Sequence, residues 1–442
     1  MKLGVISLGC DKATVDSERL VGALVGHGAV VTPDLAGADV ILVNTCGFID
    51  AAKQESIDAI LSAASLKAQG VKAVVAVGCL VQRYKQELQR EIPEVDLFLG
   101  FSDLHHLVPE LAQRGLIDDP VAAHPGVRQF LGDQPHVRYL KISEGCDHTC
   151  AFCAIPLMRG KHRSEPLERL VREAQTLEAR GAREINLVAQ DLGHYGRDLG
   201  RGGRGGVGAR LPELLEALLA GTSVPWYRLL YVYSAGLTDR LVELMGRNAR
   251  ILPYIDMPIQ HASDRMLERM RRPERRSTLR EKLRWLRSAI PDLAIRTTCL
   301  VGFPGETDQD FRDLLEFLDE AQFDRLGAFA YSPQEGTRAA AYADDVPDAV
   351  KRERLEELLE VQRAISAERL ARFVGRETPV LVDRIADPDE EGATHVGRVP
   401  WQADDVDGVT HLERGGWGAP GSFVRARITA SEDYDFRAVA LT

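Results

Sequence analysis

The chain has 442 residues and a formal net charge of −11, and 45% of its residues are hydrophobic and 27% charged. This composition is typical of a globular, soluble protein, and the length excludes a single ordinary core and predicts two or three domains. Because nucleic-acid phosphates attract basic surfaces, the negative charge disfavours broad non-specific binding to nucleic acid and suits a basic partner.

The cysteine count and the apolar runs indicate the compartment. Seven cysteines, an odd number, in a large chain without an export signal favour reduced thiols and metal ligation over a disulfide framework. The N-terminal apolar run is too short for a signal peptide, and no stretch approaches the roughly 20 apolar residues of a membrane span. We therefore expect a cytoplasmic protein that makes no membrane contact.

Residues 1–118 alternate apolar runs with helix-like segments, which predicts a parallel α/β sheet with helices on its faces. The expected strands are Leu3–Leu8, Val40–Val43, Val74–Val77 and Leu97–Leu99. Cys10, Cys46 and Cys79 each follow one of the first three strands and precede a helix. Strand ends share one edge of a parallel sheet and helix N-termini favour thiolates, so we expect a three-ligand site. For a lone cysteine, a buried small hydrophobe would be the better interpretation.

Residues 119–136 are predicted to form a linker, because they combine several prolines and glycines with little periodicity. Residues 137–370 then contain six strand candidates separated by helical segments, fewer than the eight units of a closed TIM barrel. The expected strands are Val137–Ser143, Glu184–Gln190, Trp226–Tyr233, Ile251–Met257, Ala294–Phe303 and Arg325–Ser332. An open (β/α)6 partial barrel is therefore predicted, with a lateral mouth wide enough for part of a macromolecule.

One stretch of this central region, residues 265–287, is rich in arginine and lysine. Such a run can form a basic patch for RNA. A solvated helical face is the favoured interpretation.

The tightest motif of the chain is the C-x3-C-x2-C trio formed by Cys146, Cys150 and Cys153. Thiolates are soft ligands that suit zinc or iron–sulfur clusters. Structural zinc sites usually have four protein ligands, and His148 and His162 do not complete a zinc spacing. A cubane cluster normally takes four cysteines, so three leave one iron with a coordination position open to a small molecule. A zinc loop or a redox-sensing trio remains the alternative.

With the aromatic Phe152 before its last cysteine, this motif resembles the signature of the radical S-adenosylmethionine enzymes. The resemblance implies that Cys146, Cys150 and Cys153 hold a [4Fe–4S] cluster. It also implies that the free iron of this cluster chelates the amino and carboxyl groups of S-adenosyl-L-methionine. The open partial barrel is the shape that this family leads us to expect.

The same resemblance implies which other residues lie close to S-adenosylmethionine. Phe152 belongs to the cluster loop, and Gln190 occupies a place that often faces this cofactor. Gly302 lies in Thr297–Glu306, which resembles the family's segment alongside the adenine. Cys299 in that segment has no partner cysteine nearby, and we interpret it as a core residue.

The segments around Cys10, Cys46 and Cys79 look like the N-terminal domain of the methylthiotransferases, which carry two clusters. The resemblance implies that these three cysteines bind a second [4Fe–4S] cluster. The open iron of that cluster would hold the sulfur species that is transferred.

Residues 371–442 change to short alternating strands divided by glycine and proline turns, which predicts a small antiparallel β-barrel. Its position and size resemble the TRAM domain that ends methylthiotransferases and is often an RNA-binding module. Residues 376–442 contain 7 Arg, no Lys and 13 Asp or Glu. Such an acidic face would repel RNA and attract a basic protein, although acids placed for solubility are the alternative.

Within the family, Gly145–His148 and Asp256–His261 look like the RimO-type branch, whose enzymes modify an aspartate of small-subunit ribosomal protein twelve. The resemblance implies a radical methylthiotransferase that adds a methylthio group to the β-carbon of that aspartate. This scheme needs no side-chain general base, so the catalytic residues are left unassigned. One departure is Tyr233–Ala235, where the family pattern has a proline after the tyrosine.

The implied partners are a basic ribosomal protein substrate, contact with the ribosome, and an electron donor and a sulfur donor that are both unidentified. Two alternatives stay open. One is a tRNA methylthiotransferase acting on a modified adenosine. The other is a non-catalytic iron–sulfur sensor or a zinc-binding RNA protein.

Overall fold

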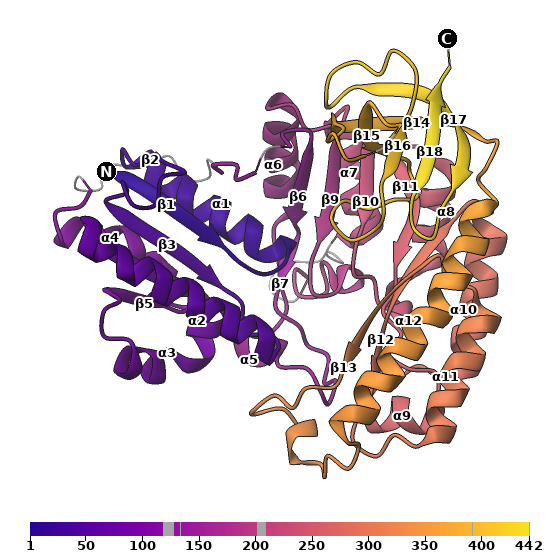
Figure 1. Ribbon diagram of the computed structural model, residues 1–442, viewed down its shortest axis with the longest axis horizontal. Helices are drawn as coiled ribbons and strands as arrows, with labels where there is room; N and C mark the ends of the chain where they lie inside the picture. Colours follow the sequence, from indigo (N-terminus) through magenta and orange to yellow (C-terminus); the bar gives the residue numbers. More distant parts are fainter. Residues whose placement is uncertain (118–127, 133, 201–208, 391, 442) are drawn as a thin grey trace.

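The computed structural model describes residues 1–117, 128–132, 134–200, 209–390 and 392–441. Three sheet-based units follow one another along the chain: a parallel sheet, a larger parallel sheet and a closed barrel. In Figure 1 the first unit lies beside the second, and the barrel lies over one end of the central strands. Within the described ranges, no helix has the length and apolarity that crossing a bilayer requires.

The N-terminal unit is a sheet of five parallel strands in the order β2-β1-β3-β4-β5. Its elements are β1 (Lys2–Ser7), α1 (Asp11–Gly26), β2 (Val30–Val31), β3 (Val40–Thr45), α2 (Asp50–Ser65), β4 (Ala73–Gly78), α3 (Cys79–Glu91), β5 (Leu97–Leu99) and α4 (Leu107–Gln113). Side chains alternate across β3, so Leu42 packs with α1 and α4 and Val43 packs with α2 and α3. The predicted parallel sheet with helices on its faces is therefore confirmed.

The central unit is a sheet of six parallel strands in the order β13-β12-β11-β10-β9-β6. Its strands and main helices are β6 (Val137–Lys141), α6 (Leu167–Ala179), β9 (Glu184–Val188), α7 (Leu211–Gly221), β10 (Trp226–Leu229), α8 (Asp239–Arg247), β11 (Ile251–Asp256), α10 (Arg276–Ala289), β12 (Ala294–Val301), α11 (Asp308–Ala321), β13 (Arg325–Ala330) and α12 (Asp348–Ala371). The edge strands β6 and β13 are not paired with each other in the described part of the chain. The open (β/α)6 barrel is thus confirmed.

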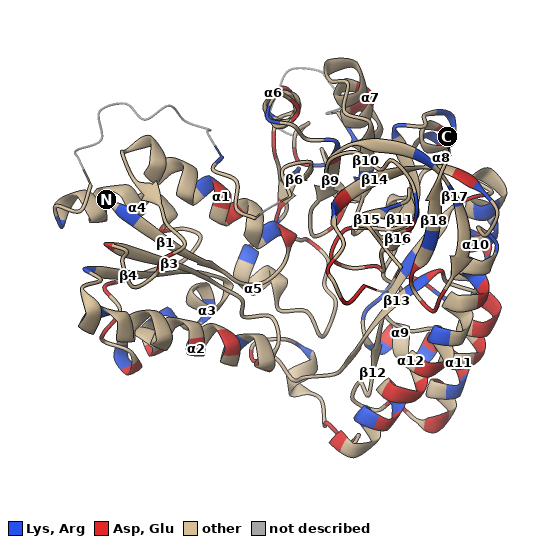
Figure 2. Cartoon of the chain, turned by 45° about the horizontal axis from the view of Figure 1, so that its top comes forward, with Lys and Arg blue, Asp and Glu red and all other residues tan. Residues whose placement is uncertain are grey.

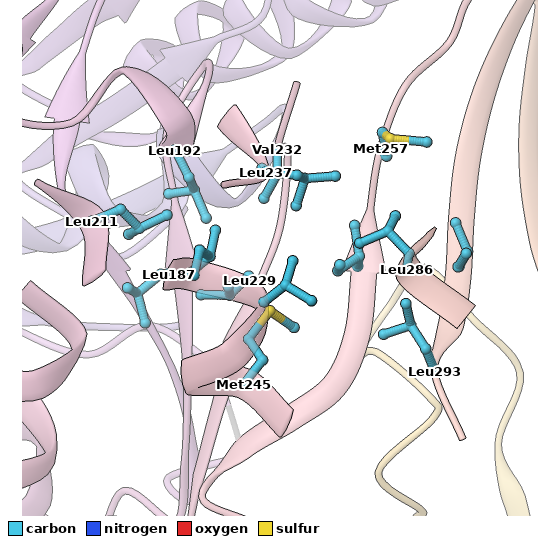
Figure 3. Packing of buried hydrophobic residues seen from close by; sticks show 14 of the residues in the cluster. Leu187, Leu192, Leu211, Leu229, Val232, Leu237, Met245, Met257, Leu286 and Leu293 are labelled. Carbon is cyan, nitrogen blue, oxygen red and sulfur yellow. The ribbon is translucent and has the colours of Figure 1, made fainter. Parts of the chain in front are cut away.

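The core of the central unit lies between the strands and the outer helices. Leu187 of β9 and Leu229 of β10 share one buried cluster with Leu211 of α7 and Met245 of α8, as Figure 3 shows. Each of these side chains is at most 4% exposed. Burying such side chains contributes about 1.5–3 kcal/mol each, which holds the strand ends in fixed positions.

The C-terminal unit is a closed barrel in the order β14-β15-β16-β18-β17. Its strands are β14 (Glu377–Ile385), β15 (His395–Arg398), β16 (Thr410–Leu412), β17 (Phe423–Ser431) and β18 (Phe436–Ala440). Four of its pairings are antiparallel, but β16 and β18 run parallel, which the expectation of an antiparallel barrel did not include. The parallel pair closes the barrel, because β18 returns beside β16 after the long β17 strand.

Buried ion pairs join the three units. Glu184 of β9 accepts hydrogen bonds from Arg228 of β10 at 2.7 Å and from Arg398 of β15 at 2.6 Å.

The predicted linker lies partly outside the described residues, and its described end is anchored. Arg128 there is buried and pairs with Glu18 of α1 and, at 2.9 Å, with Glu173 of α6. The boundaries at residues 118, 136 and 370 remain predictions.

One expected strand proved to be two short ones. The predicted strand Val137–Ser143 ends at Lys141, and β7 (Ser143–Glu144) pairs antiparallel with β8 (Arg163–Ser164) in a separate small sheet. The chain leaves the central sheet at this point because β8 binds the segment from the far side of the cysteine loop. The loop is therefore closed at its base by backbone hydrogen bonds.

Candidate metal centres

The first cysteine trio lies at one edge of the N-terminal sheet. Cys10 caps the N-terminus of α1, Cys46 directly follows β3, and Cys79 is the first residue of α3. The backbones touch there: a Cβ added to Gly9 would lie 3.3 Å from Cys46 Cβ, and one added to Gly47 would lie 3.1 Å from the Cys79 carbonyl carbon. The structure thus brings together three cysteines that are more than 30 residues apart in sequence, as the strand-end argument predicted.

The thiols of this trio interact electrostatically. The pKa of Cys79 is raised to about 11, chiefly by burial; Arg159 acts to lower it, and the nearby Cys10 and Cys46 act to raise it. Burial also raises the pKa of Cys46, and Cys10 contributes in the same direction. Cys46 and Cys79 therefore favour the protonated thiol, and metal loading would release their protons.

The second trio lies in a loop between β7 and α5 (Ile155–Arg159). Gly145 has φ +76°, and a Cβ there would lie 2.2 Å from the Lys161 carbonyl oxygen, so the turn requires glycine. The Cys146 N–H donates to the Gly160 carbonyl at 3.1 Å, which ties the two ends of the loop together. Burial raises the pKa of Cys146 to about 11 and that of Cys153 to about 12, with Cys150 adding to both shifts.

An aromatic stack lies against Cys150. The Tyr233 hydroxyl is 3.2 Å from Cys150 Sγ, and its ring stacks on His148 at 4.0 Å. The Arg272 guanidinium lies 4.0 Å from the centre of the same ring and 3.9 Å from Cys150 Sγ. His148 is held in turn by Asp191, 2.7 Å away. A thiolate at Cys150 would therefore accept a hydrogen bond from Tyr233 and have a cation beside it.

The spacing of the sulfur atoms bears on whether each trio could hold a single zinc ion. Tetrahedral zinc holds sulfur ligands at about 2.3 Å, which places the sulfurs about 3.8 Å apart. Of the residues that the structure describes, neither trio has its three sulfur atoms all within 4.8 Å of one another. A cubane binds each cysteine through a different iron and accepts this wider spacing. As they stand, the three sulfurs of neither trio are close enough together to bind one tetrahedral zinc ion.

The two trios are neighbours. Cys79 of the first trio shares a buried cluster with Ala154, which directly follows Cys153 of the second, and with Met158 of α5. Arg159 at the end of α5 lies close enough to Cys79 to lower the pKa of its thiol. Helix α5 thus joins the two candidate centres.

Comparisons with known proteins agree with this arrangement. Family models match residues 2–100 (uncharacterized protein family UPF0004), 140–318 (radical SAM superfamily) and 374–441 (TRAM domain). Ribosomal protein uS12 methylthiotransferase RimO of Anaeromyxobacter sp. (strain Fw109-5) is 45% identical over 97% of this chain and 91% of its own. The RimO protein of Desulforudis audaxviator (strain MP104C) is 46% identical over 100% of this chain and 97% of its own. The chain belongs to the RimO family.

A solved structure supports the fold of this family member. The radical S-adenosylmethionine methyltransferase TsrM from Kitasatospora setae matches with a TM-score of 0.55 at 14% identity, covering 74% of this chain and 72% of TsrM. That likeness concerns the fold alone. The relatives cited above are named for ribosomal protein uS12, so the tRNA alternative is not favoured, and the match to enzymes disfavours a non-catalytic sensor.

The three residues expected beside S-adenosylmethionine have different surroundings. Phe152 is half-buried and packs edge-on to Phe303, 6.5 Å between ring centres. Gln190 Nε2 lies 3.3 Å from Glu144, while its Oε1 is buried and has no partner among the described residues. Gly302 has φ +68° and its N–H is bound by Glu306, so a turn requires glycine there whatever it contacts. Their role at the cofactor stays a prediction, whereas Cys299 is fully buried, as expected of a core residue.

Sequence reasoning missed Arg159, Tyr233 and Arg272 as site residues. Tyr233 did carry a signal, since it stands where the family pattern is broken, just past the end of β10. Tyr233 has the extended backbone angles that a residue before proline favours, and it begins a short 3-10 turn. Its backbone conformation is therefore kept although serine stands where the family pattern has proline. Arg159 and Arg272 gave no signal that separates them from the many other arginines.

Proposed function

We propose that the protein is a radical S-adenosylmethionine methylthiotransferase that adds a methylthio group to the β-carbon of an aspartate in ribosomal protein uS12. Cys146, Cys150 and Cys153 would hold one [4Fe–4S] cluster. The first trio would hold a second. The observation that carries the proposal is the pair of neighbouring trios, each one ligand short of a complete cubane set.

The protein's own part is to bind and orient the clusters and S-adenosylmethionine. When bound, the clusters and S-adenosylmethionine supply single-electron chemistry, which can remove hydrogen from an unactivated C–H bond. Cys146 and Cys153 are buried or half-buried, which keeps water from the centre they form. The Tyr233 hydroxyl and the Arg272 cation would stabilise a thiolate at Cys150. We place S-adenosylmethionine beside Phe152, Gln190 and Gly302, where the unpaired Gln190 oxygen offers a buried acceptor.

Contact with a basic substrate is supported by charge. The C-terminal barrel carries more acidic than basic residues, and several of its acids lie in the segment Asp404–Asp407. Asp405 acts electrostatically on Asp11 of α1, beside the first trio. A basic ribosomal protein entering here would meet acidic groups close to the candidate centre. Its modification would take place in the cytoplasm, on the free protein or on the ribosome.

Metal analysis of anaerobically reconstituted protein tests the two centres. The wild-type chain should contain about eight iron atoms, and Cys46→Ala and Cys150→Ala about four each, since a cubane has four. Cys299→Ala is the matched control, because that thiol is fully buried in the core of the central unit and belongs to neither trio, so the iron count should stay unchanged. Zinc in place of iron would contradict the proposal.

Product analysis tests the reaction and the substrate. Cys150→Ala should abolish cleavage of S-adenosylmethionine to 5′-deoxyadenosine, while Cys46→Ala should keep this cleavage and lose methylthio transfer. Mass spectrometry of uS12 and of tRNA, each incubated with the wild-type protein, identifies the acceptor. A methylthio gain on tRNA alone would refute the uS12 assignment.

A further inference from the structure

Lys12 is a buried cation without a carboxylate partner. Three lysines are buried in the part of the chain that the structure describes: Lys12, Lys141 and Lys351. The second and third each pair with two carboxylates. The Lys12 ammonium forms neither an ion pair nor a hydrogen bond with any described residue. A buried ammonium without a partner is destabilising, so its presence points to an anion that is not part of the chain.

The Lys12 ammonium lies against the face of an aromatic ring. Its Nζ is 3.2 Å from the centre of the Tyr231 ring, which belongs to the loop after β10 of the central unit. The ring face attracts a cation but leaves its charge in place. Tyr231 has φ +64°, a left-handed conformation that a bulky side chain rarely adopts. Backbone strain of this kind is concentrated at functional sites, where surrounding contacts maintain it.

Two carboxylates act on Lys12 electrostatically, and both have other donors. Asp256 pairs with Arg296 at 3.1 Å and accepts a hydrogen bond from the Tyr231 N–H at 3.2 Å. Asp11 accepts a hydrogen bond from the Tyr231 hydroxyl at 3.4 Å. The three N–H donors of the Lys12 ammonium therefore remain available for a further acceptor.

Lys12 lies between the two candidate centres. It follows Cys10 of the first trio by two residues, in the first turn of α1. Its partner Tyr231 precedes Tyr233 by two residues, and the Tyr233 hydroxyl lies 3.2 Å from Cys150 of the second trio. In Figure 2, basic and acidic segments lie together where the N-terminal unit meets the central one. In the proposed reaction both centres must reach the same carbon atom, so an anion bound by Lys12 lies where that carbon is needed.

We infer that Lys12 selects an aspartate in the substrate by binding the side-chain carboxylate of the acceptor residue. The inference rests on the proposed function and names the group that recognises its acceptor. The carboxylate of an aspartate is bonded directly to the β-carbon, so an ammonium that holds the carboxylate also positions the carbon that is modified. A hydrogen bond between two charged groups is stronger than one between neutral groups. Lys12 forms and breaks no covalent bond in this role.

The charge of the surroundings explains why such a cation is needed. The acids of the segment Asp404–Asp407 attract a basic protein as a whole but repel a carboxylate that it carries. Asp405 acts electrostatically on Asp11, the residue before Lys12, so this repulsion reaches the position of the ammonium. The cation offsets it for an aspartate and gives no such gain to an uncharged side chain.

The experiment measures the affinity of the reconstituted holoprotein for two forms of uS12. One form has the acceptor aspartate, and the other has asparagine there, which has nearly the same shape and no charge. Lys12→Met keeps the apolar stem and removes the charge, whereas Lys12→Arg keeps the charge. Lys282→Met is the matched control, because Lys282 of α10 also lies over a ring, 4.6 Å from the centre of Trp285, but donates to the Leu237 carbonyl. Calorimetry gives the affinities, and mass spectrometry gives the methylthio product.

We expect wild type to bind the aspartate form about tenfold to a hundredfold more tightly than the asparagine form, as a hydrogen bond between charged groups predicts. Lys12→Met should bind the two forms equally, with its KM for uS12 raised by the same factor. Its iron content and its affinity for S-adenosylmethionine should equal those of wild type. Lys12→Arg should retain part of the preference, and Lys282→Met all of it.

Several outcomes would overturn the inference. Equal affinity of the wild-type protein for both forms of uS12 does so without any variant. A Lys12→Met protein that still prefers the aspartate form does so too. Weaker binding of S-adenosylmethionine by Lys12→Met in the absence of uS12 would assign the ammonium to the carboxylate of that cofactor. A loss of about four iron atoms in Lys12→Met would assign it to the first trio.

The failure of the proposed function has a different signature. A wild-type protein that forms no methylthio product on uS12 would contradict the proposed function itself. A wild-type protein that modifies uS12 while Lys12→Met keeps its preference for aspartate would contradict only the role of Lys12.

Discussion

Arg159→Met removes the arginine that joins the two candidate centres. The Arg159 side chain is buried and pairs with Asp16 of α1 at 2.6 Å and with Glu144 of β7 at 3.1 Å. Its guanidinium also lies 4.3 Å from the centre of the Phe101 ring. Methionine keeps most of the apolar stem and removes the charge, so the change isolates the ion pairs from the packing.

The stability cost of Arg159→Met depends on which partners Asp16 and Glu144 retain. Leaving a buried charge without its partner costs about 3–5 kcal/mol. Asp16 and Glu144 both retain Lys141, which lies 2.7 Å from Glu144 and also contacts Asp16. We therefore expect Arg159→Met to lower the opening free energy of α1 by about 2–3 kcal/mol, below the full penalty.

Hydrogen exchange of α1 peptides in the cluster-free protein measures this opening directly. A double-mutant cycle with Asp16→Asn should give a coupling energy of about 1.5–3 kcal/mol, as expected for a hydrogen bond between charged groups. Arg19→Met is the matched control: Arg19 also crosses between the units, to Glu173, but its side chain is 23% exposed. That change should cost less than about 1 kcal/mol. A coupling below about 0.5 kcal/mol for Arg159 and Asp16 would refute the reasoning.

Three further substitutions should each alter a different measured property of the protein. Burial raises the pKa of Asp404 to about 6 from 3.8, so its ionised form is penalised in the folded state and stability is lost as the pH rises between these values. Asp404→Asn should therefore raise the free energy of unfolding in urea by about 2–3 kcal/mol at pH 8 and by little near pH 4, whereas a pH-independent gain would be inconsistent. Gly302→Ala should destabilise the cluster-free protein by about 1–3 kcal/mol in thermal unfolding, because φ is +68° and the new Cβ would lie 2.4 Å from Lys351 Cγ; unchanged stability would exclude this explanation. Tyr233→Phe removes the hydroxyl 3.2 Å from Cys150 Sγ, and the loss of about 1 kcal/mol corresponds to about 40 mV, so a redox titration should find a lower potential for that cluster.

Most of the fold was predictable because its signals are local. Runs such as Val40–Val43 and Ala73–Val77 are apolar throughout, as buried parallel strands require, and the segments between them have helical periodicity. The limits of prediction appear where pairing depends on distant segments. The break between β6 and β7 depends on β8 beyond the cysteine loop, and the parallel β16–β18 pair depends on how the barrel closes.

The cysteines of both candidate centres could be found from sequence for different reasons. The second trio is a compact spacing in one loop, visible without any fold. The first trio needed the fold argument, because Cys10, Cys46 and Cys79 converge only if their strands are parallel neighbours, and β1, β3 and β4 are.

By itself, the sequence determined most of the secondary structure, the parallel sheets and the candidate thiol ligands, because apolar periodicity and ligand chemistry are properties of short stretches. Only the tertiary structure decided which charged and aromatic side chains surround those thiols. Arg159 meets Asp16 across 143 residues, Arg272 meets Cys150 across 122, and Tyr233 meets Cys150 across 83. Nothing local distinguishes one arginine from another, since the partner of each is selected by the packing of whole units against each other.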